Sequence, residues 1–254
     1  MRTPTLTLVT LGAAFGLRNV SPFCLKIEML LTALGLPFDT DVQPDPRKAP
    51  KGKLPYLMAD GRCLPDSELI TEYLNELTAG RVYEGLSDRD RARGVALARL
   101  VEDHLYWLFV ASRWLDDAWF PHVVDGFFHI APRLVRPLVA GAARRQVRRA
   151  LHLHGLGRHT RPGQVGFVRR DLQALDVLVR DTAFLFGNTP NVFDFTVAGF
   201  MAGVYDNRPK TWVTALAEDY DALRGYTERV QERVGVYGRV VDERGAPPVP
   251  AADA

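Results

Sequence analysis

Cysteine is scarce in this sequence: Cys24 and Cys63 are the only two among 254 residues. Two cysteines cannot form a disulfide framework, a cysteine-built zinc site or a cysteine-ligated iron–sulfur cluster, so these classes of protein are excluded. Low cysteine usage also favours a reducing compartment, and we predict a cytoplasmic protein.

Long apolar runs are absent too. The longest lies at about residues 197–205 and contains two glycines, whereas a transmembrane helix needs about 18 or more apolar residues in succession. At the amino terminus Thr5, Thr7 and Thr10 alternate with apolar residues, which is typical of a strand and argues against a signal peptide. We therefore predict a soluble protein without a transmembrane segment.

Neither sign of charge is in excess. The 32 basic and 30 acidic side chains leave a net charge of +2, which gives no general attraction to nucleic acid. The hydrophobic fraction of 47% and the charged fraction of 24% are ordinary for a globular chain. At about 150 residues per domain, a chain of this length is expected to form two domains.

The first third of the chain mixes strand and helix signals. Ser21-Pro22 is typical of a helix N-cap followed by proline in the first turn. Asp60-Gly61 predicts a two-residue hairpin turn. The first two strands should be parallel, because a helix connects them, and the last two antiparallel. Strands are expected at 5–11, 38–42, 53–58 and 62–64, and helices at 22–34 and 68–77.

Strand patterns end near residues 78–81, which we interpret as a linker. Beyond it a long helix is expected to start at Ser87, and further helices at 165–184, 192–205 and 220–234. The helix at 192–205 is expected to begin with a capping box at Asn191. The predicted organisation is an α/β domain over residues 1–80 and an all-α domain over residues 81–240. Residues 241–254 are rich in Pro and Ala and are predicted to be disordered.

Four passages together resemble one family, the glutathione S-transferase superfamily, and within it the metaxin and failed-axon-connections branch. The likeness extends to about Tyr237, and it implies a thioredoxin-like N-terminal domain, an all-helical C-terminal domain, and glutathione as a co-substrate with no other cofactor. It also implies a homodimer. The passages are residues 21–26 (Ser-Pro-Phe-Cys-Leu-Lys), 50–55 (Pro-Lys-Gly-Lys-Leu-Pro), 104–107 with 112–114, and 155–159 (Gly-Leu-Gly-Arg-His).

Ser21 is the candidate catalytic residue, because it stands where serine-type members of this family hold the sulfur of glutathione. A free thiol has a pKa of about 8.5 and is only slightly ionised at neutral pH. The N–H groups at a helix start and a hydroxyl at its cap both favour an anion. The first tyrosine of the chain is Tyr56, which excludes a tyrosine-type site on the first loop. The alternative is that Ser21 only caps the helix.

Cys24 stands where a C-x-x-C motif would have its second cysteine. The attacking thiolate of that motif is the first cysteine, at the very start of the helix, where the helix dipole acts most strongly. We therefore expect a buried, inert thiol at Cys24.

The resemblance implies a glutathione-binding set made of Lys53, Leu54, Pro55, Asp66 and Ser67. A cis peptide bond before Pro55 would turn the backbone of Leu54 toward the cysteinyl part of glutathione, and Lys53 would meet the glycyl carboxylate. Ser67 and the N–H groups at its helix start suit the γ-glutamyl carboxylate, and Asp66 suits the neighbouring amine. The alternatives are a trans proline in an edge strand and simple helix capping by Asp66 and Ser67.

Aromatic side chains of the helical domain form a candidate pocket for an apolar second substrate. Its proposed residues are Tyr106, Trp107 and Trp114. Core packing is the common alternative for aromatic residues at helical spacing.

An arginine-rich segment lies between Gly126 and Arg170, with ten arginines and no acidic residue. Residues 133–170 are a candidate surface for peripheral contact with an anionic partner, and ion pairing within the chain is the alternative. Three histidines within it, His152, His154 and His159, lack a nearby carboxylate, so no metal site is expected.

Two functions follow from this sequence. The first is a glutathione transferase that joins the thiol of glutathione, or of a similar small thiol, to a soft electrophile. The second is a non-catalytic protein of the same fold, of metaxin-like type, that uses its basic helical surface for interaction.

Overall fold

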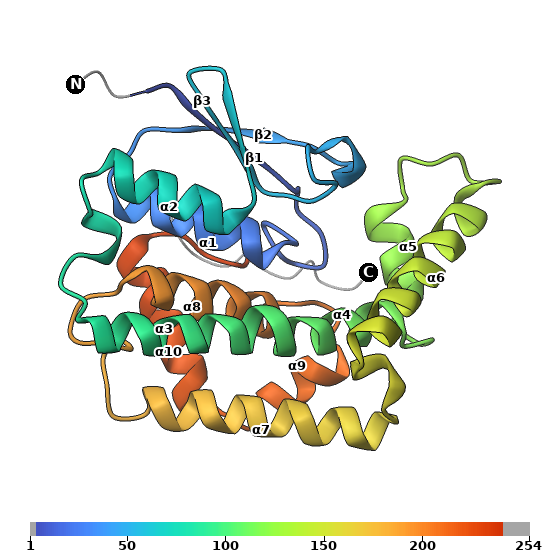
Figure 1. The fold of residues 1–254 in the computed structure, drawn as a ribbon. Helices are drawn as coiled ribbons and strands as arrows, with labels where there is room; N and C mark the ends of the chain where they lie inside the picture. Colours follow the sequence, from blue (N-terminus) through green and yellow to red (C-terminus); the bar gives the residue numbers. More distant parts are fainter. Residues whose placement is uncertain (1–3, 241–254) are drawn as a thin grey trace, which may run out of the picture.

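The amino-terminal part is a four-stranded sheet with two helices on one face (Figure 1). The computed structural model describes residues 4–240, so the predicted disordered tail at 241–254 lies outside the described residues. The strand order is β2-β1-β3-β4, with β1 parallel to β2 and antiparallel to β3. The elements are β1 (Leu6–Thr10), α1 (Pro22–Ala33), β2 (Asp39–Val42), β3 (Tyr56–Ala59), β4 (Arg62–Pro65) and α2 (Ser67–Leu77).

The rest of the described chain is helical, and α1 and α2 lie between it and the sheet (Figure 1). The predicted fold class, a thioredoxin-like domain followed by an all-helical domain, is confirmed. The helices of this second, helical part are α3 (Asp88–Arg99), α4 (Tyr106–Trp114), α5 (Phe120–Phe127), α6 (Arg136–His154), α7 (Arg161–Val179), α8 (Val192–Tyr205), α9 (Trp212–Ala217) and α10 (Asp221–Val234). A π-helical segment, Leu100–Leu105, joins α3 to α4.

The helix expected at 165–184 is displaced in the structure, where α7 spans Arg161–Val179. Thr160 takes the extended N-cap conformation and Pro162 occupies the first turn, and both are start signals that the apolar periodicity alone does not contain. Helices α5 and α9 were not predicted, because each is short and neither has a long apolar repeat.

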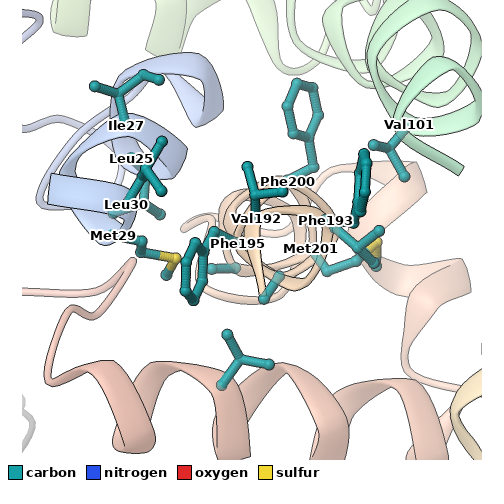
Figure 2. Close-up of a cluster of buried hydrophobic side chains, with 14 of the residues drawn as sticks. Leu25, Ile27, Met29, Leu30, Val101, Val192, Phe193, Phe195, Phe200 and Met201 are labelled. Atoms are coloured by element: carbon teal, nitrogen blue, oxygen red, sulfur yellow. The ribbon is translucent and has the colours of Figure 1, made fainter. Parts of the chain in front are cut away.

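Helix α8 is the centre of the core, and all of its residues are buried. Figure 2 shows its side chains packed between α1 on one side and Val101 on the other. At its start the predicted capping box is present, with Asn191 accepting from the amide of Phe193 and Asp194 accepting from the amide of Asn191. The hydroxyl of Tyr226 also donates to Asp194, at 2.7 Å. Helix α8 therefore connects the sheet part to the helical part through one continuous core.

Gly94 lets α3 approach α8 closely, because a Cβ at this position would overlap the ring of Phe193. We expect Gly94→Ala to lower the free energy of unfolding by about 1–3 kcal/mol, since overpacking outweighs the gain in helix propensity. Urea unfolding measures the effect. Gly141→Ala in α6 is the control, because its nearest atom, Nη1 of Arg145, lies 3.8 Å from the added carbon. A Gly94→Ala protein as stable as the Gly141→Ala protein would contradict this packing.

A charged network joins α1 and α2 to the long helix that contains α3 and the π-helical segment. Lys26 and Glu102 form an ion pair of 2.5 Å, and both side chains are less than one tenth exposed, at 9% and 7%. Arg99 donates to the second oxygen of Glu102 at 3.2 Å and also pairs with Glu68 at the start of α2. This network ties the sheet part to the helical part by charge as well as by apolar packing.

Candidate functional site

The strand register brings the predicted site segments to one edge of the sheet. Tyr56, the first residue of β3, pairs with Val9 near the end of β1 and with Pro65 at the end of β4. The loop that follows β1, the Leu54-Pro55 dipeptide before β3 and the Asp66-Ser67 dipeptide after β4 therefore leave the sheet at the same edge.

Ser21 is the N-cap of α1, as predicted. Its backbone is extended, its hydroxyl accepts from the amide of Cys24 at 3.4 Å, and its side chain is largely buried. No acidic residue occupies the first turn of α1, so the positive end of the helix dipole is not offset there. In this contact the hydroxyl of Ser21 acts as the acceptor that caps α1.

Asn19 positions Ser21, and sequence reasoning missed it. Its Oδ1 accepts from the backbone amide of Ser21 at 3.0 Å, and its Nδ2 donates to the hydroxyl of Thr10 at 2.6 Å. Asn19 is 6% exposed, and a buried amide with both ends bonded fixes the loop between β1 and α1. An asparagine two residues before a helix cap was the available signal.

Cys24 is buried one turn inside α1. Burial raises the pKa of its thiol, and hydrogen bonds with Ser21 and Thr10 only partly oppose that rise. The thiol is therefore neutral at physiological pH and is no nucleophile.

The Leu54-Pro55 peptide bond is cis. Leu54 is buried in a small cluster with Val9, Cys24 and Ala49, which places it against the start of α1. Lys53, next to it, is exposed and has no acidic partner within the described residues.

Helix α2 begins at Ser67, one residue earlier than expected, and Asp66 is its N-cap. The Oδ1 atom of Asp66 accepts from the amide of Glu68 at 2.9 Å. Asp66 has a φ of +83°, which is rare for a residue with a side chain and indicates stored backbone strain of about 1–3 kcal/mol. Such strain is concentrated at functional sites. Ser67 is 7% exposed beside it.

The three aromatic residues of the predicted second-substrate pocket face different neighbours. Tyr106 contacts Phe23 of α1 at 5.1 Å between ring centroids, Trp107 lies against His154 of α6, and Trp114 stacks on Phe127 of α5 at 5.8 Å. Tyr106 alone reaches the sheet part near Ser21. Burial raises the pKa of Tyr106, so its hydroxyl stays protonated.

Arg113 is buried and lies about two helical turns after Tyr106, on the same face of α4. Its guanidinium lies 5.3 Å from the ring of Phe15 in the loop between β1 and α1. Phe15 also lines a surface hollow of about 460 Å³ together with His122, Gly126 and Arg208.

Part of the arginine-rich segment pairs within the chain, as the alternative interpretation predicted. Arg144 pairs with Asp117, Arg161 with Asp116 and Arg169 with Asp219. On α6, which extends from the body of the molecule in Figure 1, three exposed arginines have no acidic partner in the described part of the chain. These are Arg145, Arg148 and Arg149.

Among residues 4–240, no group of three His, Cys, Asp or Glu side chains is arranged to hold a metal ion. Within the same range, no helix is both long and apolar enough to cross a membrane.

Two family models match the chain. Residues 22–119 match a glutathione S-transferase N-terminal domain, and residues 168–230 match a glutathione S-transferase C-terminal domain. The stretch between the two matches, residues 120–167, holds α5 and α6.

Relatives with known names cover most of the chain. An isoprene-epoxide glutathione S-transferase of Rhodococcus sp. (strain AD45) is 28% identical over 88% of this chain and 96% of its own length. Failed axon connections of Drosophila melanogaster is 24% identical over 89% of this chain. The match covers 55% of the length of the fly protein. A rice glutathione S-transferase solved with glutathione has the same fold, with a TM-score of 0.58 at 16% identity over 97% of this chain and 92% of the rice chain.

Proposed function

The chain belongs to the glutathione S-transferase family, and on that premise we propose that it binds glutathione and transfers it to a soft electrophile. The observation that carries the proposal is the convergence of Ser21, the cis Leu54-Pro55 bond and Asp66-Ser67 at one edge of the sheet. The sheet domain, proposed at residues 1–80, supplies the thiol site. The helical domain, proposed at residues 81–240, supplies the wall that faces it.

Ser21 acts on the sulfur. Lowering the pKa of a thiol by two units requires about 2.7 kcal/mol of selective stabilisation of the thiolate. The hydroxyl of Ser21 donates to the thiolate while its oxygen accepts from the amide of Cys24. The positive end of the α1 dipole, which no acidic residue in the first turn offsets, adds a further favourable charge.

The peptide part of glutathione is held by the other segments of the same edge. The backbone of Leu54 pairs with the cysteinyl unit, and Lys53 meets the glycyl carboxylate. Ser67 and the first amides of α2 bind the γ-glutamyl carboxylate. One oxygen of Asp66 caps α2, and its other oxygen is available to the γ-glutamyl amine.

The relative that acts on isoprene epoxide supports an epoxide as the electrophile. In that reaction the thiolate sulfur bonds to one epoxide carbon, and the bond from that carbon to oxygen breaks. The oxygen keeps the electron pair of the broken bond and takes a proton from water. The product is a hydroxy thioether, and no oxidant or reductant is consumed.

Calorimetric titration with glutathione tests the proposal. We expect saturable heat with the wild type and about tenfold weaker binding in Ser67→Ala, because a hydrogen bond to a carboxylate contributes about 1.5 kcal/mol or more. Ser87→Ala is the matched control, since Ser87 also begins a helix but lies in α3. No heat at millimolar glutathione would contradict the proposal.

A cytoplasmic homodimer is part of the same proposal. The reduced cysteines, Cys24 buried and Cys63 exposed without a disulfide, support the compartment. The dimer is supported by family membership.

The second candidate, a non-catalytic interaction protein, is favoured by the basic face of α6. This face carries Arg145, Arg148 and Arg149 next to the exposed apolar side chains Leu138 and Leu153, a combination suited to an anionic surface. It lies outside both family matches, and the match to Failed axon connections also supports this candidate. If glutathione gives no heat, reversing the charge of these three arginines should abolish binding to vesicles that contain an anionic lipid.

A further inference from the structure

Helix α6 has one face on the protein and one face in solvent. It packs against α4 and α5 and lies at the outer margin of the molecule (Figure 1). Ala140, Val147 and Leu151 recur at helical spacing on its inner face, and Ala140 and Leu151 are fully buried. The opposite face of α6 is therefore directed away from the rest of the described chain.

Leucine and arginine share this outer face. Leu138, Arg145, Arg149 and Leu153 follow one another at intervals of seven, four and four residues, which places them on one stripe of the helix. Leu138 is 71% exposed and Leu153 is 68% exposed, and the arginines between them are exposed as well. The stripe is about 22 Å long at 1.5 Å per residue.

The turn that leads into α6 extends the apolar part of this surface. Leu134, which is 96% exposed, stands one helical turn before Leu138, and Ile130 and Val135 beside it are exposed too. Half of the large exposed apolar side chains of the described residues lie between residues 130 and 153. Clustered apolar side chains of this kind mark an interaction surface.

A basic hollow lies toward the other end of the stripe. Its volume is about 400 Å³, and it is lined by Arg145, Arg148, Arg149, His152 and Leu153. No acidic side chain lines it. A guanidinium binds phosphate through two parallel hydrogen bonds, so the hollow is suited to phosphate groups that lie next to apolar matter.

We propose that α6 lies along the surface of an anionic lipid bilayer, with its arginines on the lipid phosphates and its exposed leucines inserted beside them. A bilayer offers both kinds of contact to one helix face, because its phosphates and its acyl chains lie within about 5–10 Å of each other in depth. The inference rests on the second candidate function for the use of α6 as a contact surface. It names the partner of that surface, and it holds whether or not the protein is a transferase.

Nucleic acid and an acidic protein are the competing occupants. The phosphates of nucleic acid account for the arginines, but they leave Leu134, Leu138 and Leu153 in water. A bilayer accounts for the leucines as well, since burial of apolar side chains adds to the attraction between the arginines and anionic lipid. Variants of the two residue types therefore distinguish these occupants.

Flotation of the 254-residue chain with lipid vesicles measures the contact. The wild type should float with vesicles of phosphatidylcholine that contain about 30% phosphatidylserine, and should bind pure phosphatidylcholine vesicles at least about tenfold more weakly. Reversing the charge of Arg145, Arg148 and Arg149 to Glu should weaken binding by about 100-fold or more. The control reverses three exposed arginines on other elements and should weaken it about threefold or less. These are Arg81, Arg89 and Arg233.

The leucines test insertion without any change of charge. Leu138→Ser and Leu153→Ser should each weaken binding to the anionic vesicles by about tenfold, because each removes a buried apolar side chain from the lipid. The double change Val177→Ser with Leu178→Ser is the matched control. Both residues are exposed apolar side chains on α7, and their loss should leave binding unchanged. Folding is checked by circular dichroism, and substitutions at such exposed positions have little effect on it.

Fluorescence gives a direct readout of depth. Leu138→Trp should bind the anionic vesicles as the wild type does, and the added tryptophan should be quenched by brominated phosphatidylcholine. The signal is the difference from the wild type, which has four tryptophans of its own. Val177→Trp is the control and should show no added quenching.

Three results would overturn the inference. The first is a wild type that does not bind the anionic vesicles. The second is binding that depends on the three arginines but is unchanged in Leu138→Ser and Leu153→Ser and gives no quenching in Leu138→Trp. That result would keep α6 as a charged contact surface, so the second candidate function would stand while insertion fails. The third is self-association of the wild type without lipid that Leu138→Ser abolishes, because a second copy of the chain would then cover this face. Failure of the transferase proposal appears separately, as missing glutathione binding with vesicle binding intact.

Discussion

Ser21→Ala is expected to lower turnover at pH 7 by about 10- to 30-fold. The expected loss follows if the hydroxyl supplies most of a two-unit reduction in the thiol pKa, because the ionised fraction of bound glutathione at pH 7 then falls from most of the thiol to a few per cent. Raising the pH to about 9.5 should restore most of the rate, since the thiol ionises there without help. The pH dependence of kcat for both proteins measures this.

Ser87→Ala controls for the loss of a helix cap. Ser87 accepts from the amide of Asp90 at the start of α3 just as Ser21 does from Cys24 in α1, and either substitution should cost about 1 kcal/mol of stability. Ser87→Ala should keep its turnover at every pH. A Ser21→Ala protein whose rate is reduced equally at pH 7 and at pH 9.5 would contradict the assignment of Ser21 to the thiolate.

The Lys26–Glu102 ion pair gives the largest expected effect on stability. Glu102→Leu should cost about 3–5 kcal/mol of unfolding free energy, because it leaves the buried ammonium of Lys26 without an anion. Lys26→Met should cost less, since Glu102 keeps Arg99 at 3.2 Å. Urea unfolding of the two proteins measures the difference.

Two further variants make this test specific. The double change Lys26→Met with Glu102→Leu should recover most of the loss, because replacing both partners of a buried pair by apolar groups is often close to neutral. Lys210→Met removes an exposed ion pair with Glu218 and should cost about 1 kcal/mol or less. If Glu102→Leu costs no more than Lys210→Met, the pair does not join the two parts of the molecule.

Much of the fold was predictable because its signals are local. Three short motifs each determine a helix start or a turn within a few residues: Ser21-Pro22, Asp60-Gly61 and Asn191. Helix α1, the β3–β4 hairpin and α8 lie where these motifs indicate. The helices that periodicity missed or displaced, α5, α7 and α9, depend on caps and on tertiary packing instead.

The candidate site was predictable only in part. Its sheet-edge residues follow one another in recognisable motifs, and the family resemblance assigned their roles. Asn19 bonds to Thr10 and Ser21, which are near it in the sequence, but buried Arg113 pairs with Asn207, which is 94 residues away. Pairing of this kind has no periodic or motif signal, so it emerges only from the structure. The aromatic pocket shows the reverse, because Tyr106, Trp107 and Trp114 are near one another in sequence but face different helices.

The ionisation of bound glutathione tests the central claim most directly. Thiolate absorbs in the ultraviolet where thiol does not, so a pH titration of the complex gives the pKa of the bound sulfur. With the wild type we predict a pKa about two units below the free value of about 8.5, and in Ser21→Ala a return toward that value. A bound thiol that titrates like free glutathione in the wild type would contradict the account.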